Sequence, residues 1–409
     1  MKHLLAQHER RLRKAGFTSA QLSTEIHVPV AKIVSSVVTG KQAALTFSLS
    51  DDRYPLRTYN IYINDVPLFV AYGRDVPAQI PEIRETVELV GGPNKIEVGV
   101  LNDRGAESYR AMVSVDYREK TKGDLYFVGF GVSQYADQRL NLKYADKDVS
   151  DLAAVFSRMQ SQYGAMHIRT FLNGEVTVEQ IRAAKELLSG AKADDTLILF
   201  IAGHGVHDND SNATYYFLTH DADLKNLKGT AADFELIEDM LQGVAPRNKL
   251  FLMDTCESGE NDEKVEGGYY AAAGSRGIQA RAARGLKATT AAKSAPQPRR
   301  FLLEKDRYVY NDLSRRSGAI VFSSSRGGEF SYESDAISNG FFTREIIIGL
   351  MNSADQNHDG FVSVDELRDF VSNSVAGKTG DLQHPTVDHD NLYQKFAFPL
   401  PAAQPARGP

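Results

Sequence analysis

From residue 123 onward, short apolar segments alternate with segments whose apolar residues recur at helical spacing. "LYFVGFGV" (125–132) is a nearly unbroken apolar run, whereas "DVSDLAAVFSRM" (148–159) has the helical period. "TVEQIRAAKELLSGA" (177–191) opens with a threonine that can cap a helix. Further buried strands are predicted at 195–205, 249–256 and 318–325, and a helix at 231–244. This alternation predicts an α/β domain in which helices cover both faces of a mostly parallel sheet.

The preceding segment, residues 24–118, has a different pattern. Short alternating segments such as "YNIYINDVPL" and "NKIEVGVL" are separated by the turn sequences "GGPN" and "NDRG". Strands at this spacing, without a helical period, predict a small antiparallel β-sandwich of immunoglobulin type. Residues 1–23 predict a basic amphipathic helix, and residues 399–409 predict an unstructured tail.

The α/β alternation, which we assign to residues 123–398, stops between residues 260 and 317. The stretch 271–300 is rich in alanine, glycine, serine and proline, and it carries several arginines and lysines but no acidic residue. A composition of this kind cannot bury enough apolar surface to fold. We therefore predict a flexible basic loop over residues 260–317.

Charge and cysteine content limit the environment of the protein. The 409 residues carry a net charge of −6 and include one cysteine, so an intrachain disulfide is excluded and a reducing compartment is favoured. No run of about 18 uncharged apolar residues occurs, and the basic loop has no aromatic residue between 271 and 300. We expect a cytoplasmic protein that has neither a nucleic-acid nor a membrane partner.

The single cysteine and one histidine stand at the ends of two predicted strands. "LILFIAGHG" ends near His204 and "LFLMDTC" ends at Cys256, 256 − 204 = 52 residues later. If these strands are neighbours in a parallel sheet, both side chains emerge at one edge, where the imidazole can activate the thiol as a nucleophile. The amides of Gly205 and Cys256 could then stabilise an oxyanion. The alternative is a small buried cysteine and a solvated histidine.

These segments carry a family resemblance. "FIAGHGV", "LFLMDTCESG", "KYADKDVSDLAAVF" and "GAIVFSSSRGGEFSYES" together resemble the caspase-like cysteine peptidases, in particular the prokaryotic metacaspases and orthocaspases, over residues 123–398. The resemblance implies the caspase–hemoglobinase fold and peptide hydrolysis through an acyl-enzyme, with Cys256 as nucleophile and His204 as acid and base. The β domain is similar to the one that precedes the peptidase in bacterial WD40-caspase proteins. One departure is Glu257, where metacaspases commonly have histidine.

The resemblance also bears on substrate choice. Asp254 stands two residues before Cys256, so a strand places both side chains on one face. Metacaspases have an aspartate here and a second that corresponds to Asp148, and the two bind a P1 arginine or lysine. We assign Asp148, Asp254 and Ser323 to substrate binding, because two carboxylates can hold a guanidinium through charge-assisted bonds. The basic loop would then be a substrate of the same site in an autoprocessed zymogen, or else an ordinary solvated insertion.

Residues 355–366, "DQNHDGFVSVDE", match the twelve-residue EF-hand loop between two predicted helices. The expected calcium ligands are Asp355, Asn357, Asp359, the carbonyl of Phe361, Ser363 and Glu366. The alternative is a helix–turn–helix in which the aspartates and the asparagine only cap helix ends. Calcium in metacaspases is bound by a different acidic cluster, for which Asp221 and Asp223 are the candidates.

Three functions are compatible with these patterns. The first is a cysteine endopeptidase that cleaves protein or peptide substrates after arginine or lysine. The second is a catalytically silent caspase homologue, a calcium-responsive interaction module whose β-sandwich docks an unknown protein partner. The third is a peptidase with acidic P1 specificity, which the lack of an arginine next to Cys256 disfavours.

Overall fold

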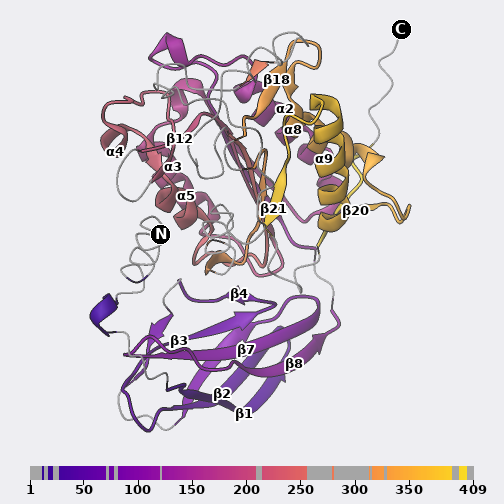
Figure 1. Ribbon diagram of the computed structural model, residues 1–409. Coiled ribbons are helices and arrows are strands. Elements are labelled where there is room, and N and C mark those ends of the chain that lie inside the picture. The colour runs from indigo at the N-terminus through magenta and orange to yellow at the C-terminus, as the bar shows by residue number, and fades with distance from the viewer. Residues whose placement is uncertain are drawn as a thin grey trace.

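A computed structural model of the 409-residue chain describes residues 12, 17–21, 27–70, 73–77, 82–119, 122–208, 214–255, 279–280, 313, 316–326, 329–388 and 396–402. Figure 1 shows an all-β domain below an α/β domain. Cys256, most of the predicted basic loop and most of the predicted N-terminal helix lie outside the described residues; a short 3-10 helix, η1 (Ser19–Gln21), precedes the β domain.

The β domain consists of two antiparallel sheets around one core. One sheet has the order β1 (Val30–Thr39), β2 (Gln42–Ser50), β6 (Ile83–Glu88). The other has the order β4 (Val66–Pro67), β3 (Leu56–Ile63), β7 (Gly92–Asn102), β8 (Ala111–Tyr117), and β5 (Arg74–Asp75) also pairs with β3. Phe47, Ile61 and Val98 are fully buried where the two sheets face each other. The predicted antiparallel β region is confirmed.

The α/β domain is built on a six-stranded sheet. Its order is β10 (Met166–Leu172), β9 (Leu125–Gly131), β11 (Thr196–Gly203), β15 (Asn248–Thr255), β17 (Ile320–Ser323), β21 (Thr386–Asp388). The first five strands are parallel to one another, and β21 is antiparallel to β17. This mostly parallel sheet confirms the prediction from the apolar runs.

Helices cover both faces of this sheet (Figure 1). One face packs against α2 (Ala145–Ser157), α8 (Phe341–Ile348) and α9 (Val364–Thr379), and the other against α3 (Val178–Ala184) and α5 (Phe234–Leu241). The alternation of β15 shows why its sequence is continuously apolar, since Leu252 faces the α2 side and Phe251 faces the α5 side. Thr177 caps α3 by accepting a hydrogen bond from the amide of Gln180, as the sequence predicts.

Shorter elements complete the domain. The 3-10 segments are η2 (Gln138–Leu140), η3 (Gln160–Gln162), η4 (Asn173–Glu175) and η5 (Lys185–Leu188); a π-helical segment, η6 (Gly349–Ser353), continues α8, and α4 spans Leu227–Thr230. Three small sheets are formed by β12 (Gly205–His207), β13 (Tyr215–Phe217) and β14 (Ala232–Asp233); by β16 (Gln279–Ala280), β18 (Tyr332–Ser334) and β19 (Asn339–Gly340); and by β20 (Phe361–Ser363) with β22 (Ala397–Pro399). None of the helices in the described part of the chain is long and apolar enough to cross a membrane.

The two domains touch near the amino ends of the parallel strands. Asp194, just before β11, accepts a hydrogen bond from the amide of Gly91 and forms an ion pair of 2.8 Å with Lys41.

Lys249, at the start of β15, is 1% exposed, and its Nζ donates to the carbonyls of Leu241 and Ser317. Burial lowers the pKa of Lys249 well below its ordinary value, and the nearby positive charges of Arg247 and Lys185 lower it further.

The prediction of an unstructured tail over residues 399–409 is wrong for its first four residues. Pro399 ends strand β22, the amide of Leu400 donates to the carbonyl of Gly360, and Ala402 exchanges hydrogen bonds with Arg158. The segment is ordered because its backbone groups are paired. Residues 403–409 lie outside the described residues.

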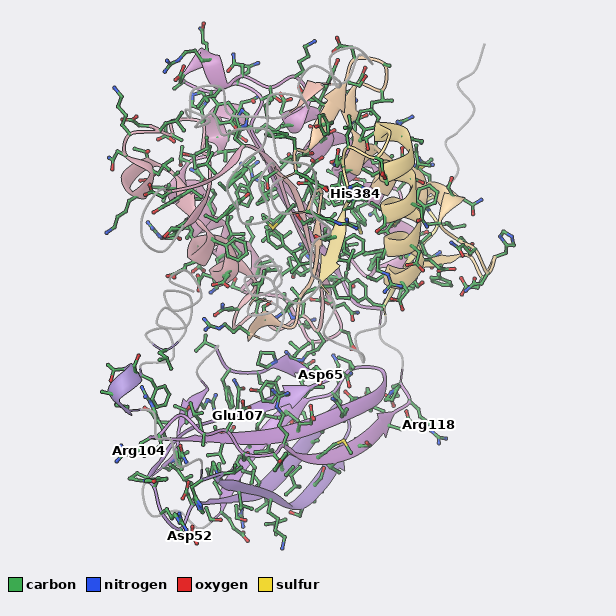
Figure 2. All side chains as sticks on the ribbon, viewed as in Figure 1. Asp52, Asp65, Arg104, Glu107, Arg118 and His384 are labelled. Carbon is green, nitrogen blue, oxygen red and sulfur yellow. The ribbon has the colours of Figure 1, made fainter. Side chains whose placement is uncertain are left out.

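Charged side chains are spread over the surface of both domains (Figure 2). The labelled groups of the β domain are Asp52, Asp65, Arg104, Glu107 and Arg118. In the α/β domain His384 lies just before β21, between the carboxylates of Glu329 and Asp381.

Candidate active site

The site is organised by the parallel pairing of β11 with β15. The two strands are paired from Thr196 and Asn248 up to Gly203 and Thr255. Neighbouring strands lie about 4.8 Å apart, so Gly203 and Thr255 end side by side at the same edge of the sheet. The next residues in the sequence are His204 and Cys256. The neighbouring strands that the sequence argument required are therefore present, while the placement of Cys256 lies outside the described residues.

The imidazole of His204 contacts a backbone carbonyl. His204 is 1% exposed, and its Nε2 lies 2.8 Å from the carbonyl oxygen of Leu140, at the end of η2. A carbonyl accepts only, so Nε2 carries a proton and the lone pair of the neutral ring stays on Nδ1. The backbone amide of His204 donates to the hydroxyl of Tyr135 at 3.0 Å. The contact with Leu140 leaves Nδ1 as the basic nitrogen, and the contact with Tyr135 fixes the backbone of His204.

Gly203 is required where β11 ends. Its φ of +153° is in the range that other residues rarely adopt. A Cβ atom at this position would meet the hydroxyl of Tyr135 at 2.9 Å and the ring of Phe217 at 3.1 Å. The glycine therefore lets the tyrosine reach the amide of His204.

Gly205, the predicted oxyanion-hole residue, lies in β12 opposite Phe217 of β13. The amide of Leu218 donates to the carbonyl of His204, and the amide of Asp208 donates to the carbonyl of Thr214. Hydrogen-bonded positions alternate along an antiparallel pair, so the even-numbered positions of this segment are the hydrogen-bonded ones. Gly205 is consequently at a non-hydrogen-bonded position, where the N–H and C=O point away from β13. Its amide can face a ligand on the open side of that strand.

The two predicted substrate-binding aspartates are buried on the same side of the sheet. Asp254 is 0% exposed and accepts from the hydroxyls of Ser331 and Thr343, each at 2.6 Å. Asp148, in the first turn of α2, is also 0% exposed and accepts from the side-chain amide of Asn339 at 2.8 Å. These partners of the two carboxylates belong to residues 331–343, where hairpin β18–β19 enters α8. One segment therefore hydrogen-bonds to both Asp148 and Asp254, which are far apart in the sequence.

Ser323 ends β17 beside Met253, and its hydroxyl donates to the carbonyl of Ser325 at 3.2 Å. The next residue, Ser324, donates its hydroxyl to the carbonyl of Thr255 at 3.1 Å. Gln383, which is fully buried, donates to the carbonyl of Ser324 and accepts from the amide of Tyr332. Together these bonds fix the ends of β15 and β17.

Hairpin β18–β19 is also attached to the start of α2. Asp335 lies 2.9 Å from the ammonium group of Lys143 and 2.7 Å from the hydroxyl of Tyr144. The bond from Lys143 and the bond from Tyr144 hold the pKa of the Asp335 carboxyl below its ordinary value, although burial acts in the opposite direction. The backbone amide of Lys143 donates to Glu333 at 3.1 Å.

Sequence reasoning missed several of these residues: Tyr135, Leu140, Ser331, Asn339, Thr343 and Gln383. Asn339 lies in strand β19, and nothing local in the sequence marks its contact with Asp148. Every residue has a backbone carbonyl, so the residue type at position 140 does not reveal that its carbonyl contacts His204.

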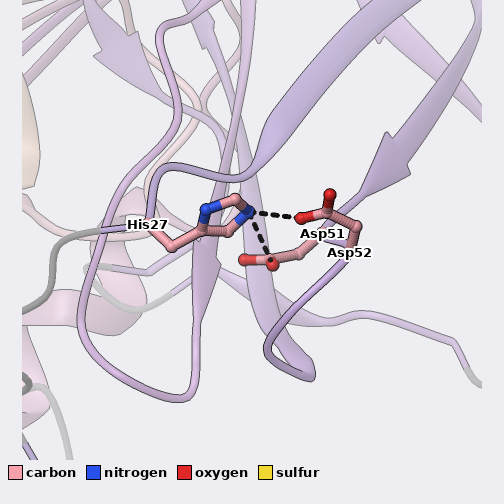
Figure 3. A group of neighbouring side chains, drawn as sticks. All are labelled: His27, Asp51 and Asp52. Atoms are coloured by element: carbon pink, nitrogen blue, oxygen red, sulfur yellow. Dashed lines mark ion pairs between the residues drawn. The ribbon is translucent and has the colours of Figure 1, made fainter.

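Within the described part of the chain, one group brings three metal-ligand atoms within 4.8 Å of one another, and it lies in the β domain. Figure 3 shows the carboxylates of Asp51 and Asp52 on the same side of the His27 ring, 3.3 Å and 2.6 Å from its Nε2. Asp51 also accepts from the amides of Arg53 and Tyr54, which is the pattern of a turn. We interpret the group as a structural ion pair.

The alternative calcium candidates do not form such a group. Asp221 accepts a hydrogen bond from the hydroxyl of Thr219, and Asp223 accepts one from the amide of Lys225. Both aspartates therefore stabilise turns, and the one cluster found among the described residues includes neither of them, nor the loop acids Asp355, Asp359 and Glu366.

Comparison with known proteins identifies the α/β domain. The caspase domain family matches residues 128–397, which is more than half of the chain. The chain belongs to the caspase domain family. The fold expected from the sequence resemblance is thereby confirmed, and the caspase domain is a cysteine peptidase domain in general terms.

Similar solved structures have low sequence identity to this caspase-domain protein. Protein GSU0716 from Geobacter sulfurreducens is 14% identical with a TM-score of 0.40, covering 65% of this chain and 92% of that one. Caspase-1 from Spodoptera frugiperda is 14% identical with a TM-score of 0.38, covering 65% and 86%. The fibronectin(III)-like modules of Clostridium thermocellum CbhA are 18% identical with a TM-score of 0.19, covering 22% and 100%. None of the curated proteins matches the chain.

Proposed function

We propose that this caspase-domain protein is a cysteine endopeptidase in which Cys256 is the nucleophile and His204 the acid and base. The observation that carries the proposal is the register that pairs Gly203 with Thr255, the residues before the histidine and the cysteine. The Nε2 contact with Leu140 supports it, because it leaves Nδ1 as the base.

The mechanism follows from these roles. Nδ1 of His204 takes the proton of the Cys256 thiol, and the thiolate attacks the carbonyl carbon of the scissile peptide bond. The amides of Gly205 and Cys256 stabilise the oxyanion that forms. The C–N bond then breaks, His204 returns the proton to the departing amine, and a water molecule that His204 deprotonates hydrolyses the thioester.

The preferred P1 residue in this proposal is arginine or lysine. Asp148 and Asp254 are buried on the same side of the sheet, and both are hydrogen-bonded to residues 331–343. A guanidinium that replaced the hydroxyl donors of Ser331 and Thr343 would offer Asp254 the same number of hydrogen bonds with a full opposite charge. Ser323, at the end of the adjacent strand, would line the same pocket.

The basic loop is the proposed site of autoprocessing. Arginines and lysines between 271 and 300 follow Cys256 closely in the sequence and match a basic P1 preference. Mass spectrometry of the purified chain is expected to find cleavage after these residues, and Cys256→Ala protein is expected to stay intact. Intact loops in both proteins would remove the zymogen part of the proposal.

The decisive assay compares fluorogenic peptides that differ only at P1, ending in arginine, lysine or aspartate. We expect turnover of the first two, and no turnover by Cys256→Ala. Asp254→Asn should lower kcat/KM for basic peptides by about 100-fold, corresponding to the loss of one charge-assisted bond of about 3 kcal/mol. The matched control is Asp239→Asn, which removes an exposed carboxylate of α5 that forms an ion pair with Lys185.

Each alternative function gives a different outcome. Cleavage after aspartate would establish acidic specificity and refute the roles of the two carboxylates. No cleavage of any peptide by a chain with an alkylatable Cys256 would favour the catalytically silent homologue.

A further inference from the structure

Residues 355–366 form a loop between the end of η6 and the start of α9, and they include strand β20. The twelve residues contain four acids, Asp355, Asp359, Asp365 and Glu366, but no lysine or arginine. Carboxylate and carbonyl oxygens are the ligands that Ca²⁺ prefers. The positions of these oxygens in the structure decide between a metal site and a loop whose acids only cap helices.

Asp355 is the residue that caps no helix. It is 5% exposed, and its Oδ2 accepts from the amide of Gly360 at 3.2 Å, which places the carboxylate inside the turn. Its Oδ1 is buried, and no donor from the described residues reaches it. A buried carboxylate oxygen without a donor is costly in a folded protein, and a cation in the turn would satisfy it.

Glu366, at the other end of the loop, already lies against the beginning. One carboxylate oxygen accepts from the amides of Gln356 and Asn357, and the other from Ser363. These bonds hold the Glu366 carboxylate beside the backbone that directly follows Asp355, with which it would share the ion.

The expected carbonyl ligand, that of Phe361, also has the required direction. The amide of Leu400 donates to the carbonyl of Gly360, and the amide of Val364 donates to the carbonyl of Phe396. The hydrogen-bonded positions of the β20–β22 pair are therefore the even-numbered ones. Phe361, opposite Pro399, is at a non-hydrogen-bonded position, and its carbonyl points away from β22. Its amide, which donates to Asp359, likewise faces the loop.

Strand β22 occupies the outer edge of the loop. Val362 and Phe398 are opposite each other and fully buried, and Phe398 packs edge-on against Phe156 of α2. The pairing gives β20 a fixed neighbour, residues 397–399 of β22. Because β22 holds Gly360 and Val362, it fixes the backbone on either side of the Phe361 carbonyl.

We propose that residues 355–366 bind one Ca²⁺ ion and that strand β22 is the second half of the site, so that calcium binding fastens the C-terminal segment to the α/β domain. Asp355, Asn357, Asp359, the carbonyl of Phe361 and Glu366 provide the oxygens. Ser363 keeps its role as the cap of α9, where its hydroxyl accepts from the amide of Glu366.

The test is isothermal titration calorimetry of the full-length Cys256→Ala chain with CaCl₂, so that neither self-cleavage nor peptidase activity affects the result. We expect one ion per chain with a dissociation constant between about 10⁻⁶ and 10⁻³ M, and weaker binding of Mg²⁺. Asp355→Asn and Glu366→Gln should each weaken calcium binding at least about tenfold. Asp369→Asn, an exposed carboxylate on α9 that pairs with Arg368, should leave it unchanged.

The role of β22 has its own test. Leu400→Pro removes the amide that donates to Gly360, whereas Leu400→Ala keeps it. Leu400→Pro should bind calcium about three- to tenfold more weakly than Leu400→Ala, as expected for one hydrogen bond. Hydrogen exchange of the Cys256→Ala chain needs no change in the strand, and calcium should slow the exchange of the amides of residues 396–398 and of Leu400.

Two results would overturn the proposal. The first is the absence of calcium binding at a calcium concentration of about 10⁻² M, ten times the weakest expected dissociation constant, or variants of Asp355 and Glu366 that bind calcium as tightly as the unchanged loop. Either would show that the loop only caps helices. Equal affinities for the two Leu400 variants together with unchanged exchange at residues 396–400 would remove β22 from the site. Neither result depends on whether the chain is a peptidase.

Discussion

The contact between Tyr135 and His204 gives the sharpest test of the proposed catalytic geometry. The amide of His204 donates to the hydroxyl of Tyr135 at 3.0 Å, and the two residues are 1% and 3% exposed. Tyr135→Phe keeps the ring but removes the acceptor, so a buried N–H loses its partner. The cost of such a loss is about 1–3 kcal/mol.

The N–H that loses its acceptor belongs to His204, the proposed base. If the backbone of His204 moves to recover a hydrogen bond, the imidazole leaves its position against the carbonyl of Leu140 and Nδ1 turns away from the thiol. A loss of 1–3 kcal/mol corresponds to a fall in kcat of about 5- to 140-fold, with KM nearly unchanged because substrate contacts stay in place. Tyr135 would thus position the base without touching the substrate.

The assay measures kcat and KM with a peptide ending in arginine, together with the rate at which iodoacetamide alkylates Cys256 as a function of pH. Tyr135→Phe should also slow alkylation near neutral pH, since a displaced imidazole stabilises the thiolate less. The control is Tyr126→Phe, which alters another buried tyrosine that stacks on His167 and not on His204. Wild-type kcat and an unchanged alkylation profile in Tyr135→Phe would refute the positioning role.

Two further predictions concern the folded state. Gly203→Ala places a methyl group against Tyr135, so it should lower kcat at least about tenfold and destabilise the chain by about 1–3 kcal/mol; Gly174→Ala, with nothing within 4 Å, is the control, and equal activity of the two would contradict the argument. Folding lowers the pKa of Lys249 from its ordinary value of 10.5, so the unfolded chain binds more protons and wild-type stability should rise as pH increases towards 10.5. Lys249→Met should lack that rise in urea unfolding followed by circular dichroism, and parallel curves for the two proteins would contradict it.

Much of the molecule could be predicted from local patterns in the chain. The apolar runs at 125–132, 195–205 and 249–256 became strands β9, β11 and β15, because a strand buried on both faces needs apolar residues at every position. The same pattern placed His204 and Cys256 just after two strands, and the twelve-residue spacing marked the loop at 355–366. Period and spacing are properties of neighbouring residues, so the sequence alone determined the fold class and the candidates for chemistry.

Only the tertiary structure decided which groups support those candidates. The carbonyl of Leu140 and the hydroxyl of Tyr135 reach His204 across 64 and 69 positions of sequence, and Asn339 reaches Asp148 across 191. Strand β22, whose last residue Pro399 falls in the predicted tail, pairs with a loop that begins at Asp355. Such contacts depend on where the sheet brings distant segments together, and a backbone carbonyl has no residue type by which the sequence could reveal it.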